Sequence, residues 1–256
     1  MIPIKHELLV ELISNPILRE EKFMPYTLSD ISSDDVLSFR KVLQFNEQEL
    51  LINPFIHTKK YISYDEIEKI SRIYFGKCGL HREMYTKKVK TYGLILFKYL
   101  LQSRKPLWLR DIAKYEFILF SQLWITGYNH DNLLNRQHIS NHYLVNNLCR
   151  LGKFSFDIEA YIENPKTTEF LFKQKTNKYL VFIGNHETPS VSTKSIDTIT
   201  YSLIRFCRQP RSILEINNFL RNQLSLNEKE STKISHSLTS LLESWNILNL
   251  FTTSAG

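Results

Sequence analysis

The stretch PLWLRDIAKYEFILFSQLW, Pro106 to Trp124, decides the fold of the first half of the chain. Pro106 suits the first turn of a helix, where its missing N–H is no loss. Apolar residues then recur at three-and-four spacing, which predicts a helix with one buried face: Leu109, Ile112, Ala113, Phe117, Phe120 and Trp124. Glu116 falls on that face, and a buried carboxylate must be hydrogen-bonded, paired or protonated. We therefore expect Glu116 to meet a specific partner.

Helical spacing continues on both sides of this stretch. One face of a long helix is predicted before it, by Tyr85, Val89, Tyr92, Leu96, Tyr99 and Ser103. Another helix is predicted after it, by Leu134, Gln137, Asn141, Leu144 and Leu148, and Gly152 suits its C-terminal cap. We therefore assign residues 1–152 to a helical domain.

The pattern changes at Gly152. Apolar and alternating runs predict short strands at 154–158, 169–173, 179–183 and 191–193. Three helices follow, two of them opened by capping boxes, Ser212 with Glu215 and Asn227 with Glu230, and residues 247–251 close as a strand. The fold class is therefore mainly α with a small α+β part, in which residues 153–256 form a winged-helix-like domain.

Composition indicates a globular protein. The chain has 256 residues, of which 43% are hydrophobic, and no apolar run approaches the roughly 20 residues that cross a bilayer. The first residues carry acids within their apolar run and lack a small-residue cleavage site, so we expect a cytoplasmic protein without membrane contact. Cys78, Cys149 and Cys207 are few and far apart, which predicts reduced, mostly buried thiols.

Positive charge is concentrated between Lys77 and Lys114. Ten basic residues in this band stand against two acidic ones, whereas the net charge of the whole chain is +7. Such a band attracts an anionic partner such as nucleic acid, an acidic peptide or an acidic protein surface. A solvated helix face explains the band equally well.

Catalytic and metal-binding motifs are absent from the sequence. It has no P-loop, no dinucleotide-binding glycine fingerprint, no GxSxG and no CxxC. His138 and His142 are one helical turn apart, with His130 upstream, but they lack the glutamate of the metalloprotease motif. We therefore expect neither enzymatic activity nor a metal site in this chain.

DNA binding is the alternative for the last domain, because residues 212–245 have helix-turn-helix spacing. The N-terminal end of the would-be recognition helix carries Glu228 and Glu230, and residues 196–256 hold six basic residues against five acidic ones. That balance argues against nucleic acid, since affinity for DNA depends on phosphate neutralisation.

Two resemblances bear on function. The run PLWLRDIAKYE from Pro106 to Glu116, preceded by FKYLLQSRK, resembles the signature of the MbnC-type partner proteins of methanobactin biosynthesis. The run from Tyr179 to Phe251, with SILEINNFL and LLESWNILNL, resembles winged-helix domains that bind leader peptides, of which the PqqD type is best known.

The resemblance implies a non-catalytic subunit of a heterodimer. Its partner is an MbnB-like multinuclear non-haem iron enzyme, so iron is in the partner and no cofactor is in this chain. The enzyme oxidises cysteines of an MbnA-like precursor peptide to oxazolone and thioamide, which yields a copper chelator. We expect the partner-binding surface at Trp108, Arg110 and Lys114, because Trp and Arg are enriched in interface hot spots.

In leader-binding winged domains the peptide joins the sheet as an extra strand beside the third helix. Carried onto this sequence, that strand edge is Val191, Ser192 and Thr193, and Pro189 suits an edge because it lacks an N–H. We expect Ile234, Leu238, Leu241 and Trp245 to serve the domain's core. The peptide-facing stripe is then Lys233, Ser237 and Ser240, with Lys233 attracting an acidic leader.

Overall fold

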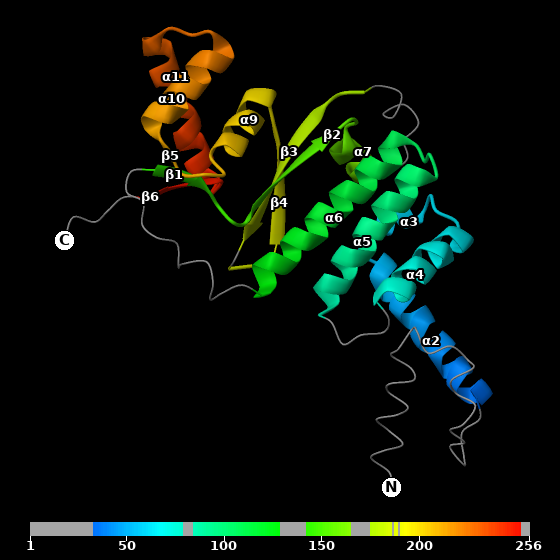
Figure 1. Ribbon diagram of the computed structural model, residues 1–256. Helices are drawn as coiled ribbons and strands as arrows, with labels where there is room; N and C mark the ends of the chain where they lie inside the picture. The colour runs from blue at the N-terminus through cyan, green and yellow to red at the C-terminus, as the bar shows by residue number, and fades with distance from the viewer. Residues whose placement is uncertain are drawn as a thin grey trace, which may run out of the picture. The chain divides into compact units, whose positions relative to one another are not determined.

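In a computed structural model of the protein, the described residues are 33–78, 84–128, 142–164, 175–185, 187–188 and 190–251. They are mostly helical, with a smaller antiparallel sheet part (Figure 1). The chain divides into two compact units, Met1–Phe117 and Ile118–Gly256. The division lies well before residue 152, where the sequence suggested it, because the chain from residue 142 onward pairs with later strands.

The first unit is built from helices. They are α2 (Ser33–Ile52), α3 (Ile56–Lys59), α4 (Tyr64–Cys78), α5 (Tyr85–Gln102) and the first half of α6 (Leu107–Tyr128). Their apolar faces meet in one core, and its fully buried members include Leu51, Phe55, Ile70, Tyr74, Tyr92, Leu96, Leu109 and Ile112. The helix predicted from Pro106 onward is confirmed.

Gly93 lets the core of this unit close. A Cβ atom built at Gly93 of α5 would lie 2.6 Å from Cδ2 of Phe117 and 3.2 Å from Cζ of Phe55. Both distances are shorter than ordinary carbon–carbon contacts. The ring of Phe117 also packs edge-on against Phe97, with centroids 5.5 Å apart, so it is held from two sides. The absence of a side chain at Gly93 is therefore a packing requirement.

Glu116 is buried and hydrogen-bonded to His57 and Thr58, as its position on the apolar face predicted. The carboxylate is 5% exposed, and its Oε1 accepts a hydrogen bond from the backbone N–H of His57 at 2.6 Å. Its Oε2 accepts from both the backbone N–H and the hydroxyl of Thr58, at 3.1 and 2.6 Å. Burial raises the pKa of Glu116 above the usual carboxyl range, although the hydrogen bonds from Thr58 and His57 act against that rise. Glu116 thus ties the short helix α3 to α6.

The second unit contains two three-stranded antiparallel sheets. The larger is a meander of β2 (Cys149–Phe154), β3 (Lys178–Asn185) and β4 (Ser190–Ile196), in which β3 is central. The smaller joins β5 (Arg211–Ser212), β1 (His142–Val145) and β6 (Leu248–Phe251), in that order. Helix α7 (Ile158–Glu163) follows β2, and α9 (Thr198–Phe206), α10 (Ile213–Leu224) and α11 (Glu228–Ser244) follow β4.

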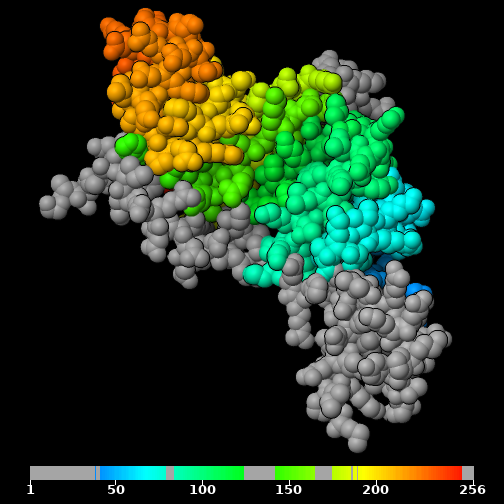
Figure 2. Space-filling model, in the orientation of Figure 1, coloured from blue at the N-terminus to red at the C-terminus, as the bar shows by residue number. Residues whose placement is uncertain are grey.

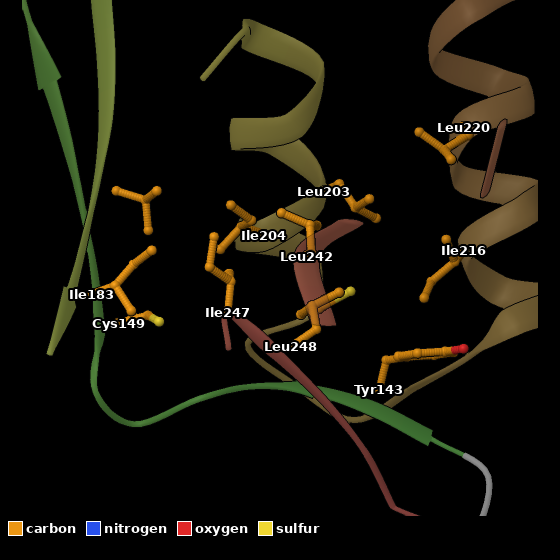
Figure 3. Close-up of a cluster of buried hydrophobic side chains, with 12 residues drawn as sticks. Tyr143, Cys149, Ile183, Leu203, Ile204, Ile216, Leu220, Leu242, Ile247 and Leu248 are labelled. Carbon is orange, nitrogen blue, oxygen red and sulfur yellow. The ribbon is translucent and has the colours of Figure 1, made fainter. Parts of the chain in front are cut away.

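The three later helices and both sheets share one apolar core. Figure 3 shows Ile183 and Cys149 of the larger sheet facing Leu203 and Ile204 of α9, with Ile216 of α10 beyond them. Cys149 and Cys207 are buried here as free thiols, and burial raises the pKa of both to about 12. Among the described residues, Cys78, Cys149 and Cys207 form no disulfide with one another, which agrees with the prediction of unpaired thiols.

Small polar residues let α10 and α11 pack closely. The most buried positions of α11 are Ser231, Ser235, Thr239 and Leu242. Ser235 donates its hydroxyl to Oδ1 of Asn217, and Nδ2 of Asn217 donates to Oγ1 of Thr232 at 3.3 Å. In the space-filling view the atoms of the two helices, in orange, form one continuous surface (Figure 2).

The helix predicted to run on to Leu148 is wrong in its described part. Residues 142–154 form β1 and β2, joined by a turn in which Asn146 accepts hydrogen bonds from the N–H groups of Leu148 and Cys149 at 3.0 Å. Gly152 is consequently a strand residue, and a Cβ there would meet the rings of Phe154 and Phe182. Leu144 and Leu148 fit helical spacing, but pairing with distant strands overrides that local pattern.

The remaining strand predictions have mixed outcomes. The strand at 154–158 is wrong, because β2 ends at Phe154 and Asp157 caps α7. The strand at 169–173 lies outside the described residues. The strands at 179–183 and 191–193, the three helices with both capping boxes, and the closing strand are confirmed.

Within the described ranges, none of the helices has the length and apolarity needed to span a membrane.

Replacing Gly93 with alanine should destabilise the protein by about 1–3 kcal/mol, because the added methyl group overpacks the core against Phe117. Gly76, in α4, is the matched control, since nothing lies within 4 Å of a Cβ built there. Gly76→Ala should leave stability unchanged or raise it by about 0.5–1 kcal/mol, as alanine favours the helix. Urea unfolding measures both, and equal effects of the two substitutions would contradict the packing role of Gly93.

Glu116→Gln should lower the free energy of unfolding by about 1–3 kcal/mol, because an amide cannot accept all three hydrogen bonds. The loss depends on pH. A carboxyl whose pKa is raised in the folded state stabilises the fold fully below its unfolded pKa, and this contribution falls as pH rises through the folded pKa. The difference between the native chain and the variant should therefore shrink from pH 4 towards neutral pH in urea titrations. A difference that grows over that range would mean that the folded chain favours the ionised form.

Candidate functional site

One side of β4 is an open strand edge. In the larger sheet β4 pairs with β3 alone, in a register that places Ser192 opposite Ile183 and Lys194 opposite Val181. Apart from this pairing with β3, residues 190–196 make no backbone hydrogen bond to another element within the part of the chain that the structure describes. Pro189, expected to support this edge, lies outside that part. The edge at Val191, Ser192 and Thr193 was predicted, and its position at the margin of the sheet agrees with that prediction.

The hydrogen bonds of β3 fix which backbone groups of β4 point outwards. The N–H of Gly184 donates to the carbonyl of Leu148 at 3.0 Å, so Gly184 directs its backbone towards β2. Backbone groups alternate along a strand, so Ile183 and Val181 direct theirs towards β4. Ser192 and Lys194, their partners, must point back at β3. The N–H and C=O groups of Val191, Thr193 and Ser195 therefore face outwards, ready to pair with an added strand.

The side chains of β4 divide between the two faces of the sheet. Directly paired residues of an antiparallel sheet share a face, so Ser192, Lys194 and Ile196 lie on the side of the core residues Val181 and Ile183. That is the side on which α9 and α11 pack. Val191 and Thr193 lie on the opposite face.

Lys194 connects the strand edge to α11. Its ammonium nitrogen lies 4.7 Å from the centroid of the Trp245 ring, within the range of a cation–π interaction. Trp245 is the C-terminal cap of α11 and packs partly against the core cluster. The expected neighbourhood of this strand and this helix is therefore present at the C-terminal end of α11.

Lys233, Ser237 and Ser240 lie outside the contact between Lys194 and Trp245. All three are exposed. At about 100° per residue they lie on the face of α11 opposite the buried row that contains Ser235 and Thr239. Their role in peptide binding remains a prediction.

The apolar flank of α11 also differs from expectation. Ile234, Leu238 and Trp245 pack only partly against the core, and Leu241 is 41% exposed. The sequence predicted that these four residues serve the domain's core, which holds in part for Ile234, Leu238 and Trp245. The small residues of α11 occupy the centre of its buried face, because they allow α10 to approach closely. An apolar side chain at Leu241 is thereby left facing solvent.

The predicted partner-binding residues all lie at the start of α6. Trp108 packs edge-on against Tyr61, with centroids 4.8 Å apart. Arg110 donates from Nε and Nη2 to the carbonyl of Lys105, at 3.2 and 3.0 Å, which braces the turn before α6. Lys114 is half-buried. Trp108 and Arg110 therefore have internal structural contacts, and a contact with another protein remains a prediction.

The basic band is partly neutralised inside the first unit. Lys88 pairs with Glu47 at 2.7 Å and Lys105 with Glu66 at 2.8 Å, and both pairs are mostly buried. Lys90 and Lys98 of α5 are exposed. The positive surface is consequently smaller than the sequence suggested.

The histidines do not form a described metal site. His142 lies in β1, where it pairs with Ser212 and Phe251 in the backbone register, while His130 and His138 lie outside the described residues. The described ranges hold no group of three histidine, cysteine or acidic side chains arranged to bind a metal ion.

Comparisons of the chain with protein-family models and with curated protein sequences give no match.

Because backbone groups alternate in direction along β4, proline should destabilise the protein to different extents at neighbouring positions. Ser192→Pro removes an N–H that points at the buried carbonyl of Ile183, which should lower the free energy of unfolding by about 1–3 kcal/mol. Thr193→Pro removes an outward N–H and should have a clearly smaller effect, because proline is tolerated on strand edges. Thermal unfolding of both variants measures the difference. A larger loss in Thr193→Pro would reverse the assignment of the open edge.

Proposed function

We propose that this chain is the non-catalytic, peptide-binding subunit of a heterodimeric complex that modifies a peptide. The observation that carries the proposal is the open edge of β4, whose Lys194 contacts Trp245 at the C-terminal end of α11. Adding a strand to an exposed sheet edge is a common way to bind an extended peptide, since main-chain hydrogen bonds supply affinity.

The order of elements supports a winged-helix-like, leader-recognition type of domain. The three-stranded meander is followed directly by the helices α9, α10 and α11, as in the domains that the sequence resembles. In the smaller sheet β5 precedes α10 and β6 follows α11, and β1 inserts between the two strands. A strand from earlier in the chain would thus occupy the place of a wing strand.

The partner in this proposal is an MbnB-like iron enzyme. It would oxidise cysteines of an MbnA-like precursor to oxazolone and thioamide, while the present chain holds the leader of that precursor. This part rests on the resemblance of the run from Pro106 to Glu116. Its docking surface is proposed around Trp108, Arg110 and Lys114, where the helical unit presents a half-buried tryptophan.

Binding of DNA through α11 is the rival reading. The N-terminus of α11 carries Glu228 and Glu230, and Glu230 closes the capping box by accepting from the N–H of Asn227 at 3.4 Å. Two carboxylates at the end that would approach phosphates repel nucleic acid. The local charge therefore favours a peptide.

Co-expression with an MbnB-like iron enzyme and a short cysteine-containing precursor peptide tests the proposal. The chain should co-elute with the enzyme, and calorimetry should detect binding of the precursor's leader. Thr193→Pro should weaken leader binding at least about tenfold, a loss of about 1.4 kcal/mol, without releasing the enzyme. Oxidation of the precursor by the chain alone, or full leader binding by Thr193→Pro, would refute the proposal.

Arg110→Ala separates the docking surface from the peptide edge in the same experiment. Weaker co-elution with an unchanged melting temperature supports a direct contact with the enzyme. Unchanged co-elution with a lowered melting temperature assigns Arg110 to the turn that it braces.

A further inference from the structure

The contact between Lys194 and Trp245 holds a positive charge beside the open edge of β4. Lys194 is half-buried, and its ammonium lies over the indole ring, so its position is constrained by α11. Within the described part of the chain Lys194 forms no ion pair with an acidic side chain. A cation held in place without a counter-charge attracts an anionic group.

An apolar surface adjoins this charge. Leu241 lies one turn before Trp245 on α11, and 41% of its surface is exposed. Leu238, one turn earlier, packs partly against the core and continues the same flank. On β4, the exposed Ser192 is small and leaves space on the face that is turned to α11. The flank of α11 that Lys194 contacts at Trp245 thus continues as an apolar surface through Leu241 and Leu238.

Strand geometry dictates which peptide residues reach this border. A strand added to β4 pairs through Val191, Thr193 and Ser195, and its side chains alternate between the two faces. The peptide residues opposite Ser192 and Lys194 turn towards α11, and they are two positions apart. One of them meets Lys194, and the other lies along the flank of Leu241.

We propose that Lys194, Trp245 and Leu241 form a specificity site that selects a peptide strand with an acidic residue two positions from an apolar one. This inference rests on the proposed binding of a peptide at β4 and adds the chemical class of that peptide. The acidic side chain pairs with the ammonium of Lys194, and the apolar side chain covers Leu241. Lys194 takes the place of Lys233, about three turns before Trp245 on α11, as the residue that attracts an acidic leader.

Selection from a library of random peptides displayed on phage tests the site with the full-length chain. The same selection is run on Thr193→Pro, Lys194→Glu, Leu241→Asp and Lys233→Glu. Lys233→Glu is the matched control, because it makes the same charge change at an exposed position of α11 about three turns before Trp245. Lys194→Gln, which removes the charge without reversing it, is the milder variant if Lys194→Glu fails to fold.

The native chain should enrich peptides that carry the acidic–apolar spacing, and Thr193→Pro should lose them. Lys194→Glu should reverse the preference to a basic residue, Lys194→Gln should abolish it, and Leu241→Asp should remove the apolar preference. Lys233→Glu should enrich the same peptides as the native chain. In anisotropy titrations, replacing the acidic residue of an enriched peptide with lysine should weaken binding about tenfold, and less at high salt, where charges are screened.

The outcomes distinguish the specificity site from the proposed binding of a peptide at β4. Peptides that depend on Thr193 but show no acidic preference, or that keep it in Lys194→Glu, would overturn the specificity site and leave the strand edge in place. Peptides that bind Thr193→Pro as well as the native chain, or a selection that enriches none, would overturn both.

Discussion

Burial of β3 on both of its faces is the constraint on which the second unit depends. Residues 180–184 are all buried, so every backbone N–H and C=O of this segment must be satisfied by a neighbouring strand. The hydrogen bond from Gly184 to Leu148 sets the phase of that pairing. This pairing then determines which backbone groups of β4 form hydrogen bonds with β3 and which face outwards. The outward direction of the remaining backbone groups of β4 therefore follows from the contact between β2 and β3.

The first unit obeys a different constraint, in which one polar contact and one steric gap act together. Glu116 holds α3 through the N–H groups of His57 and Thr58, while Gly93 admits the ring of Phe117, the next residue of α6. Shifting α6 against α5 would disturb both at once. The hydrogen-bonded carboxylate therefore specifies one arrangement among several that apolar packing alone would permit.

Local signals in the sequence were sufficient wherever a structure is decided by near neighbours. The helix from Pro106, the two capping boxes and the need of Glu116 for a partner follow from spacing and from the cost of burying charge. The strands β1 and β2 did not, because Leu144 and Leu148 fit a helix and only pairing with distant strands makes them extended. The site divides in the same way. The edge strand was predictable from its residues, whereas the importance of Lys194 depends on Trp245, some fifty residues away, and the buried face of α11 is set by the close approach of α10.

The buried thiols of the second unit have a chemical consequence for any cysteine-containing peptide bound there. With a pKa of about 12, Cys149 and Cys207 are ionised in only about one molecule in 10⁵ at neutral pH, and the thiolate is the nucleophile in disulfide exchange. Their location in the core blocks access as well. A precursor peptide bound as we propose would therefore meet no reactive sulfur at these two positions, so its own cysteines would stay free of mixed disulfides with them.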